Sequence, residues 1–172
     1  MPVLRCTRKL LKELRVSNDD LVDENESSER LGDWYANLLR IDRRKCVMFT
    51  NAATLYTFLV AGVLRKDFDR VGDLFRTHLR RTLAHDEYSA IDIDLVLEEY
   101  DTLLVGRTRD RRVLGSMNDF AWAVETCIWK EGGLQRCDLE GLNRWLNDAP
   151  MSLIGYDNGE RAMRERVSTI TG

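Results

Sequence analysis

The fold is decided by residues 34–62, which read WYANLLRIDRRKCVMFTNAATLYTFLVAG. Three runs of aromatic and aliphatic residues that favour β-strands lie within it, at positions 34–39, 46–49 and 55–60. The segments between them, Asp42-Arg43-Arg44 and Asn51-Ala52-Ala53, are short enough for hairpin connections. The stretch therefore predicts an antiparallel meander. A helix is the alternative for the first run, because it contains alanine and leucine, which are good helix formers.

The flanking sequence predicts two further strands and several helices. The strands are expected at Val3–Cys6 and Thr102–Gly106. Apolar periodicity and capping residues predict helices after Thr7, at Asp67–Ala84, after Ser89 (where residues 91–95 also alternate like a strand), after Ser116, at Asp138–Asn147 and at Asn158–Val167. Strands come early and helices late, without a regular strand–helix–strand repeat. We therefore expect one α+β domain over residues 1–172, with a small, mostly antiparallel sheet and several packed helices.

The helix after Ser116 is expected to lie in the centre of the protein. Ser116 and Asp119 have the spacing of a capping box, and apolar residues follow on most sides of the helix as far as Trp129. Two glycines at 132 and 133 are a stop signal.

The composition indicates a soluble globular chain with an unusual excess of arginine. With 172 residues, 44% hydrophobic and 32% charged, the sequence excludes collagen-like and wholly disordered proteins. The net charge is −3, yet the 26 basic residues are 21 arginines and only 5 lysines. Arginine is suited to bidentate phosphate or carboxylate recognition and equally to structural ion pairs. The segment at 17–29 is acidic without compensating bases, which predicts a solvated, flexible loop.

The sequence predicts a cytoplasmic protein without a membrane span, a metal or a cofactor. The longest nearly apolar run, residues 55–64, is about half of the roughly 20 residues that a membrane helix requires. Basic residues interrupt the amino terminus, which leaves no signal-peptide core. The four cysteines form no C-x-x-C pair, and the two histidines complete no familiar zinc spacing, so reduced and packed thiols are expected.

Two basic segments are the candidate anion- or nucleic-acid-binding sites. The first combines Arg107, Arg109, Arg111 and Arg112 with Ser116 and Asn118 at a predicted helix amino terminus, where free backbone N–H groups favour an anion. The second is the predicted hairpin tip, with Arg43, Arg44 and Lys45 next to Arg40. Helix capping and ion pairs with the chain's own acids are the competing structural explanations.

Candidates for a pocket and for catalysis are few. If residues 34–39 form a strand, Trp34 and Asn37 lie on opposite sides of it and can contribute to a pocket wall beside Asp33. The sequence contains no nucleophile elbow, phosphate loop, metal-binding helix or dinucleotide fingerprint. His85 and Asp33 are therefore the remaining candidates for a catalytic base, whereas His78 lies at the margin of an apolar helix stripe.

Three segments together resemble a family of small bacterial proteins of unknown function. They are LGDWYANL at 31–38, RRKCVMFTN at 43–51 and LGSMND at 114–119. The resemblance covers most of the chain outside the acidic loop, and it implies a bacterial, cytoplasmic setting but no catalytic residues.

Three hypotheses for function follow from these observations. The leading one is a protein that acts by binding a macromolecular partner, nucleic acid or protein, through the arginine-rich loops. The second is an enzyme with a phosphate-containing substrate, such as a small nuclease, that uses His85 or Asp33 with Arg111 and Arg112. The third is a structural homo-oligomer without a ligand, anchored by one or more of the tryptophans Trp34, Trp122, Trp129 and Trp145.

Overall fold

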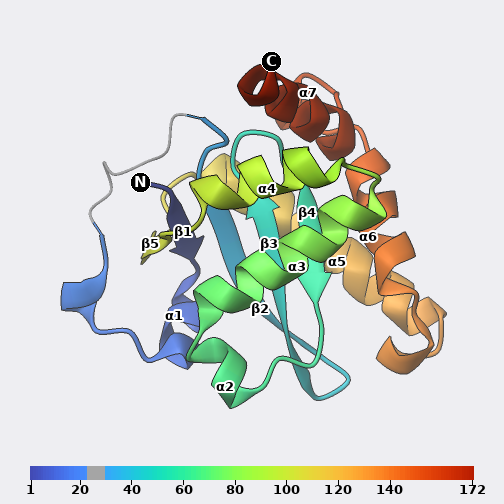
Figure 1. Ribbon diagram of the computed structural model, residues 1–172. Coiled ribbons are helices and arrows are strands. Elements are labelled where there is room, and N and C mark those ends of the chain that lie inside the picture. The colour runs from blue at the N-terminus through green and yellow to red at the C-terminus, as the bar shows by residue number, and fades with distance from the viewer. Residues whose placement is uncertain (23–29) are drawn as a thin grey trace.

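The computed structural model describes residues 1–22 and 30–172, and it shows one five-stranded sheet covered by helices on both faces (Figure 1). The strands, in the spatial order β4-β3-β2-β1-β5, are β1 (Val3–Cys6), β2 (Trp34–Ile41), β3 (Arg44–Asn51), β4 (Thr57–Val60) and β5 (Leu104–Arg107). The α+β class, expected from the sequence as a single domain, is confirmed.

The meander predicted from residues 34–62 supplies three of the five strands. Strand β2 pairs antiparallel with β3 from Trp34↔Asn51 to Ile41↔Arg44, and β3 pairs antiparallel with β4. The helical alternative for the first run is therefore wrong. The remaining pairings are parallel, because β1 lies between β2 and β5 and runs in the same direction as both. Taken together, the two antiparallel ladders join more residue pairs than the two parallel ladders, so the sheet is mostly antiparallel, as expected.

Seven α-helices, numbered in chain order, occur in the described residues. They are α1 (Arg8–Leu14), α2 (Arg65–Phe68), α3 (Val71–His85), α4 (Ala90–Glu99), α5 (Arg111–Lys130), α6 (Leu139–Asp148) and α7 (Gly159–Thr171). Three short 3₁₀ turns are η1 (Asn18–Asp20), η2 (Leu134–Arg136) and η3 (Ser152–Ile154). In Figure 1, α3 and α4 lie in front of the sheet and α5 lies behind it.

One predicted helix is divided in two. The single helix expected at Asp67–Ala84 is interrupted between α2 and α3, where Arg70 takes the non-helical dihedrals φ −130° and ψ 50°. Asp69 and Gly72 flank the interruption, and both residue types are weak helix formers.

The alternation of side chains along the strands builds two cores, one on each face of the sheet. Trp34, Phe49 and Phe58 join the first core, which α1, α3, α4 and α7 cover. Tyr35 and Met48 face the opposite way and join the second core, which α5 and α6 cover. Both faces of this sheet are therefore buried, and α5 is the main cover of the second face.

Strand β4 is at the edge of the sheet, and two amide side chains from α6 bind its outward-facing backbone groups. The Asn147 side chain accepts a hydrogen bond from Thr57 N at 2.8 Å and donates one to Thr57 O at 2.9 Å. The Asn143 side chain accepts a bond from Leu59 N at 2.9 Å. These bonds replace the neighbouring strand that β4 lacks.

The acidic loop expected at 17–29 lies partly outside the described residues, which stop at 22 and resume at 30. Its beginning is ordered: the Ser17 side chain caps η1, and Val22 forms an isolated parallel bridge with Gly106 on β5.

Candidate nucleic-acid interface

Helix α5 begins five residues before the predicted cap at Ser116. Asp110 is its N-cap, and its carboxylate accepts a hydrogen bond from Arg112 N at 2.8 Å. Ser116 lies inside the helix, where its hydroxyl donates to Arg112 O at 3.2 Å. The capping box and the anion site expected at Ser116 are therefore wrong, because Asp110 is a good cap and arginine is a good helix former.

Replacing Asp110 by alanine tests this N-cap. A lost cap costs about 1 kcal/mol of unfolding free energy. The hydrogen bond from the Arg112 side chain is the main cause that lowers the pKa of Asp110 below its ordinary value of 3.8. The stabilisation is therefore complete above that pH and disappears as the pH falls through the lower, folded-state pKa.

Urea unfolding at several pH values measures this effect. The difference between wild type and Asp110→Ala is expected to shrink below pH 3.8. Asp110→Asn should remain within a few tenths of a kcal/mol of wild type at neutral pH, because asparagine is also a good cap. A difference that stays constant down to the acid transition would show that Asp110 does not cap α5.

One face of α5 is fully turned to solvent. Its residues follow one another at alternating intervals of four and three: Arg111, Gly115, Asn118, Trp122, Glu125 and Trp129, all exposed. We call this set the α5 face. Trp122 is 70% exposed and Trp129 is 80% exposed, whereas Phe120 and Val124 on the opposite side of the helix are buried in the second core. The central buried helix expected from the sequence is therefore exposed along one face, and two of its tryptophans lie on that face.

The first basic segment surrounds the amino end of α5. Arg107 donates to Asn18 Oδ1 at 2.8 Å, and Arg112 pairs with Asp110 at 3.2 Å. Arg109 and Arg111 are exposed, and neither forms an ion pair with a residue in the described ranges. This end of the helix therefore presents two arginines that are available to a ligand.

The second basic segment lies at the tip of the β2–β3 hairpin, as predicted. Asp42 and Arg43 form the turn with φ values of 49° and 64°, the left-handed conformation of a tight hairpin. Lys45 pairs with Glu13, and the ion pair holds this lysine against α1. Arg43 and Arg44 are exposed, and no ion pair within residues 1–22 and 30–172 engages them.

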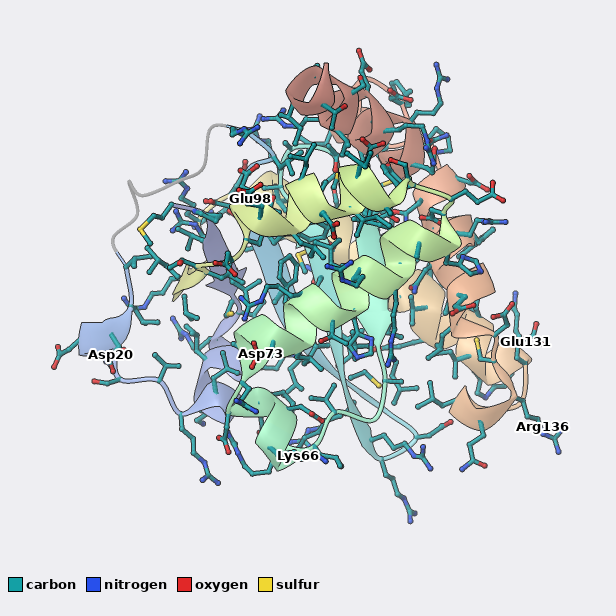
Figure 2. All side chains as sticks on the ribbon, in the orientation of Figure 1. Asp20, Lys66, Asp73, Glu98, Glu131 and Arg136 are labelled. Carbon is teal, nitrogen blue, oxygen red and sulfur yellow. The ribbon has the colours of Figure 1, made fainter. Side chains whose placement is uncertain are left out.

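The hairpin tip meets the carboxyl end of α5. The Asp42 carboxylate accepts a hydrogen bond from Leu134 N at 2.6 Å, directly after that helix. Arg40 of β2 and Trp129 and Glu125 of the α5 face line a common surface pocket. Glu131 and Arg136, both exposed, lie around the same end (Figure 2).

The two basic segments therefore lie at opposite ends of α5. A helix of 20 residues is about 30 Å long, so the segments do not form one compact site. The α5 face with its two tryptophans connects them. The arrangement is an elongated surface with arginine at both ends and exposed aromatic rings between.

The other predicted site residues lie elsewhere and are structural. Asp33 is buried and accepts bonds from Arg5 Nε at 3.0 Å and Val3 N at 3.1 Å. Trp34 is fully buried in the first core, with its ring 5.1 Å from Phe75. Asn37 accepts a bond from the Thr7 hydroxyl at 2.9 Å. The pocket wall expected from Asp33, Trp34 and Asn37 does not form.

His85 is also separate from the arginines with which the nuclease hypothesis combined it. It is the last residue of α3, and it lines a pocket together with His78, the β4 edge and α6. That pocket is lined by none of the three residues Asp33, Arg111 and Arg112. Within the described ranges, no group of three or more His, Cys, Asp and Glu side chains is arranged to hold a metal ion.

The exposure of Trp122 and Trp129 differs from the buried helix that the sequence predicts, and only the oligomer hypothesis places a tryptophan at the surface. The signal was present, because Asn118 and Glu125 share their helical face at intervals of three and four residues. A buried helix face rarely carries these residue types.

Fold and surface together define an α+β protein whose longest described helix packs on the sheet and turns an arginine- and tryptophan-bearing face outward. The chain belongs to the family Domain of unknown function (DUF6933), whose model matches residues 3–162. The resemblance to an uncharacterised family is thereby confirmed. No curated protein and no solved structure matches the chain. None of the helices in ranges 1–22 and 30–172 has the length and hydropathy needed to cross a membrane.

Proposed function

We propose that the protein binds single-stranded nucleic acid along the α5 face. The observation that carries the proposal is the pair of tryptophans, 70% and 80% exposed, on a helix with a basic segment at each end. Proteins that bind single strands combine cationic groups for the phosphates with aromatic rings on which bases stack.

The dimensions of the surface suit a short single strand. Trp122 and Trp129 are seven residues apart, so their backbone positions differ by about 10 Å along the helix. The whole surface, about 30 Å long, corresponds to roughly nine nucleotides at the stacked spacing of about 3.4 Å. In this binding mode the bases stack on the tryptophans, while Arg109 and Arg111 contact phosphates at one end and Arg43 and Arg44 at the other.

Two carboxylates on α5, Asp119 and Glu125, limit where the phosphates can lie. Both are exposed and repel a backbone placed directly over the middle of the helix. The phosphates are therefore expected at the two ends, with bases over the centre. A duplex, whose bases are not available for stacking, should bind more weakly than a single strand.

Fluorescence anisotropy with a labelled single strand of about twelve nucleotides, RNA and DNA in turn, tests the proposal. Binding should weaken strongly between about 50 mM and about 200 mM salt. Trp122→Ala and Trp129→Ala should each weaken it by roughly 5- to 150-fold, the equivalent of about 1–3 kcal/mol per stacked base. Arg43→Ala/Arg44→Ala should lower the salt slope by about 0.7 for each phosphate that these arginines neutralise.

Two matched variants serve as controls. Trp145→Ala removes a tryptophan that is 52% exposed on α6, and Arg70→Ala removes an exposed arginine between α2 and α3. Neither should change the affinity. Absence of salt-sensitive binding to RNA and DNA contradicts the proposal. A concentration-dependent dimer abolished by Trp122→Ala would contradict it too, because the α5 face would then be a protein interface.

The proposal includes a cytoplasmic location in a bacterial cell. All four cysteines are free thiols, which supports a reducing compartment. The bacterial setting rests on the family resemblance.

A further inference from the structure

A pocket lies at the β4 edge of the sheet, between β4, α3 and α6. Its volume is about 200 Å³, smaller than a typical drug-sized site. The floor is apolar, with Phe58, Leu59 and Val60, and Leu139 lies opposite. Both histidines of the chain, His78 and His85, line it.

The α3 wall of the pocket carries its cationic groups in one helical row. Arg81 follows His78 by three residues and precedes His85 by four, so the three side chains lie on neighbouring positions of one face. The Thr82 hydroxyl donates to His78 O at 2.7 Å, which leaves its oxygen as an acceptor only. The row therefore presents an arginine between two imidazoles.

The β4 edge adds a backbone donor to the same pocket. Outward-facing backbone groups alternate along an edge strand, and those of Thr57 and Leu59 are bound by Asn147 and Asn143. Ala61, the residue after β4, is the next position in this alternation, and it lines the pocket. We therefore expect the N–H of Ala61 to point outward, toward the pocket.

The negative charge at the end of α3 is already balanced. The buried Asp86 carboxylate accepts a hydrogen bond from the Tyr56 hydroxyl, and its other oxygen lies 3.6 Å from His85 Nδ1 and 4.0 Å from Arg144 Nε. Asp86 therefore orients the His85 ring and leaves the second ring nitrogen, Nε2, toward the pocket mouth.

An exposed carboxylate of the protein contacts that nitrogen. Glu140 Oε2 lies 3.3 Å from His85 Nε2, although the Glu140 side chain is 66% exposed. An exposed glutamate is held weakly, because surface ion pairs contribute at most about 1 kcal/mol. The carboxylate marks the position that another oxyanion can take.

From this arrangement we propose that the pocket binds a small organic oxyanion, a carboxylate or a phosphate, in place of Glu140. The oxyanion contacts His85 Nε2 and the Arg81 guanidinium, and a short apolar part of the ligand lies on Val60 and Leu139. The site is separate from the α5 face and does not depend on nucleic-acid binding.

The binding is expected to be stronger at acidic pH. Burial, and then the charge of Arg81, lower the pKa of His78, whereas the negative charge of a bound anion beside Arg81 acts in the opposite direction. The other charged groups near the two rings are Asp67 of α2, Asp86 directly after α3, and Glu140 and Arg144 of α6. From α7, Arg164 donates to the Asp86 carbonyl and pairs with Glu160. Binding therefore takes up a proton at His78, so affinity increases as the pH falls.

The test is NMR of the imidazole C–H groups in the full chain, where two histidines give two sets of signals. Inorganic phosphate and propionate are titrated separately, with chloride added to hold the ionic strength constant. The proposal predicts saturable shifts of both rings and tighter binding at the lower pH. The anion with the lower Kd identifies the ligand class, phosphate or carboxylate.

Three variants make the assignment specific. Glu140→Gln removes the competing carboxylate and should tighten binding about three- to tenfold, whereas Arg81→Gln should weaken it by a similar factor. Arg80→Gln, which removes the neighbouring arginine paired with Asp94, should leave the Kd unchanged. Shifts that do not saturate, or a Glu140→Gln variant that binds more weakly, would overturn the proposal.

Discussion

Replacing Asp33 by alanine is expected to lower the free energy of unfolding by about 3–5 kcal/mol. Asp33 is 6% exposed and pairs with Arg5, which is 0% exposed. The same carboxylate binds the backbone N–H of Val3 in β1. Its loss leaves a buried guanidinium without its carboxylate and a buried N–H without this acceptor, and both are costly in a low-dielectric interior.

Urea unfolding followed by circular dichroism measures the loss. Asp69→Ala is the matched control, because Asp69 pairs with Arg65 by the same chemistry but is 60% exposed. It should cost at most about 1 kcal/mol. The double variant Arg5→Met/Asp33→Ala should be more stable than Asp33→Ala, since it also removes the buried positive charge that Asp33 balances. Equal losses in Asp33→Ala and Asp69→Ala would refute a structural role for the buried pair.

Replacing Asn147 by alanine is expected to cost about 2–6 kcal/mol. Asn147 is 1% exposed and satisfies two backbone groups of Thr57 on the β4 edge. Each buried group left without a partner costs about 1–3 kcal/mol. The change also frees part of an edge strand, which promotes pairing with other chains.

Thermal unfolding and light scattering after mild heating report the two effects. Asn143→Ala is the internal comparison, because Asn143 binds only one backbone group of β4, Leu59 N. It should cost about half as much. Asn118→Ala, on the exposed face of α5, should stay within about 0.5 kcal/mol of wild type. An Asn147→Ala variant no less stable than Asn143→Ala would show that the β4 edge does not depend on the amides.

Local sequence signals were sufficient for most of the elements. The meander, β1 and the helices capped by Ser89, Asp138 and Asn158 lie where capping and alternation place them. These signals act over a few residues, so they do not depend on contacts between distant parts of the chain. The parallel pairing of β1 with β5 could not be predicted, because it joins residues about one hundred positions apart.

The candidate site was harder to predict for a similar reason. Asp110 and Ser116 are both acceptable N-caps, and the contact that favours Asp110 comes from Tyr35, whose hydroxyl accepts a bond from Asp110 N at 3.0 Å. The buried partner of Asp33 is likewise distant in sequence. Residue type alone does not reveal whether a tryptophan such as Trp129 packs inward or outward.

Strand β2 has a consequence for binding through its contacts with both ends of α5. Tyr35 holds the amino end at Asp110, and Asp42, in the turn that follows β2, holds Leu134 of η2, four residues beyond the carboxyl end of α5. One rigid strand therefore fixes the separation of the two basic segments before any ligand arrives. A preformed spacing removes the entropy cost of ordering the surface on binding. The fixed spacing also selects ligands by length, because a nucleic-acid strand too short to span α5 reaches the arginines at one end alone.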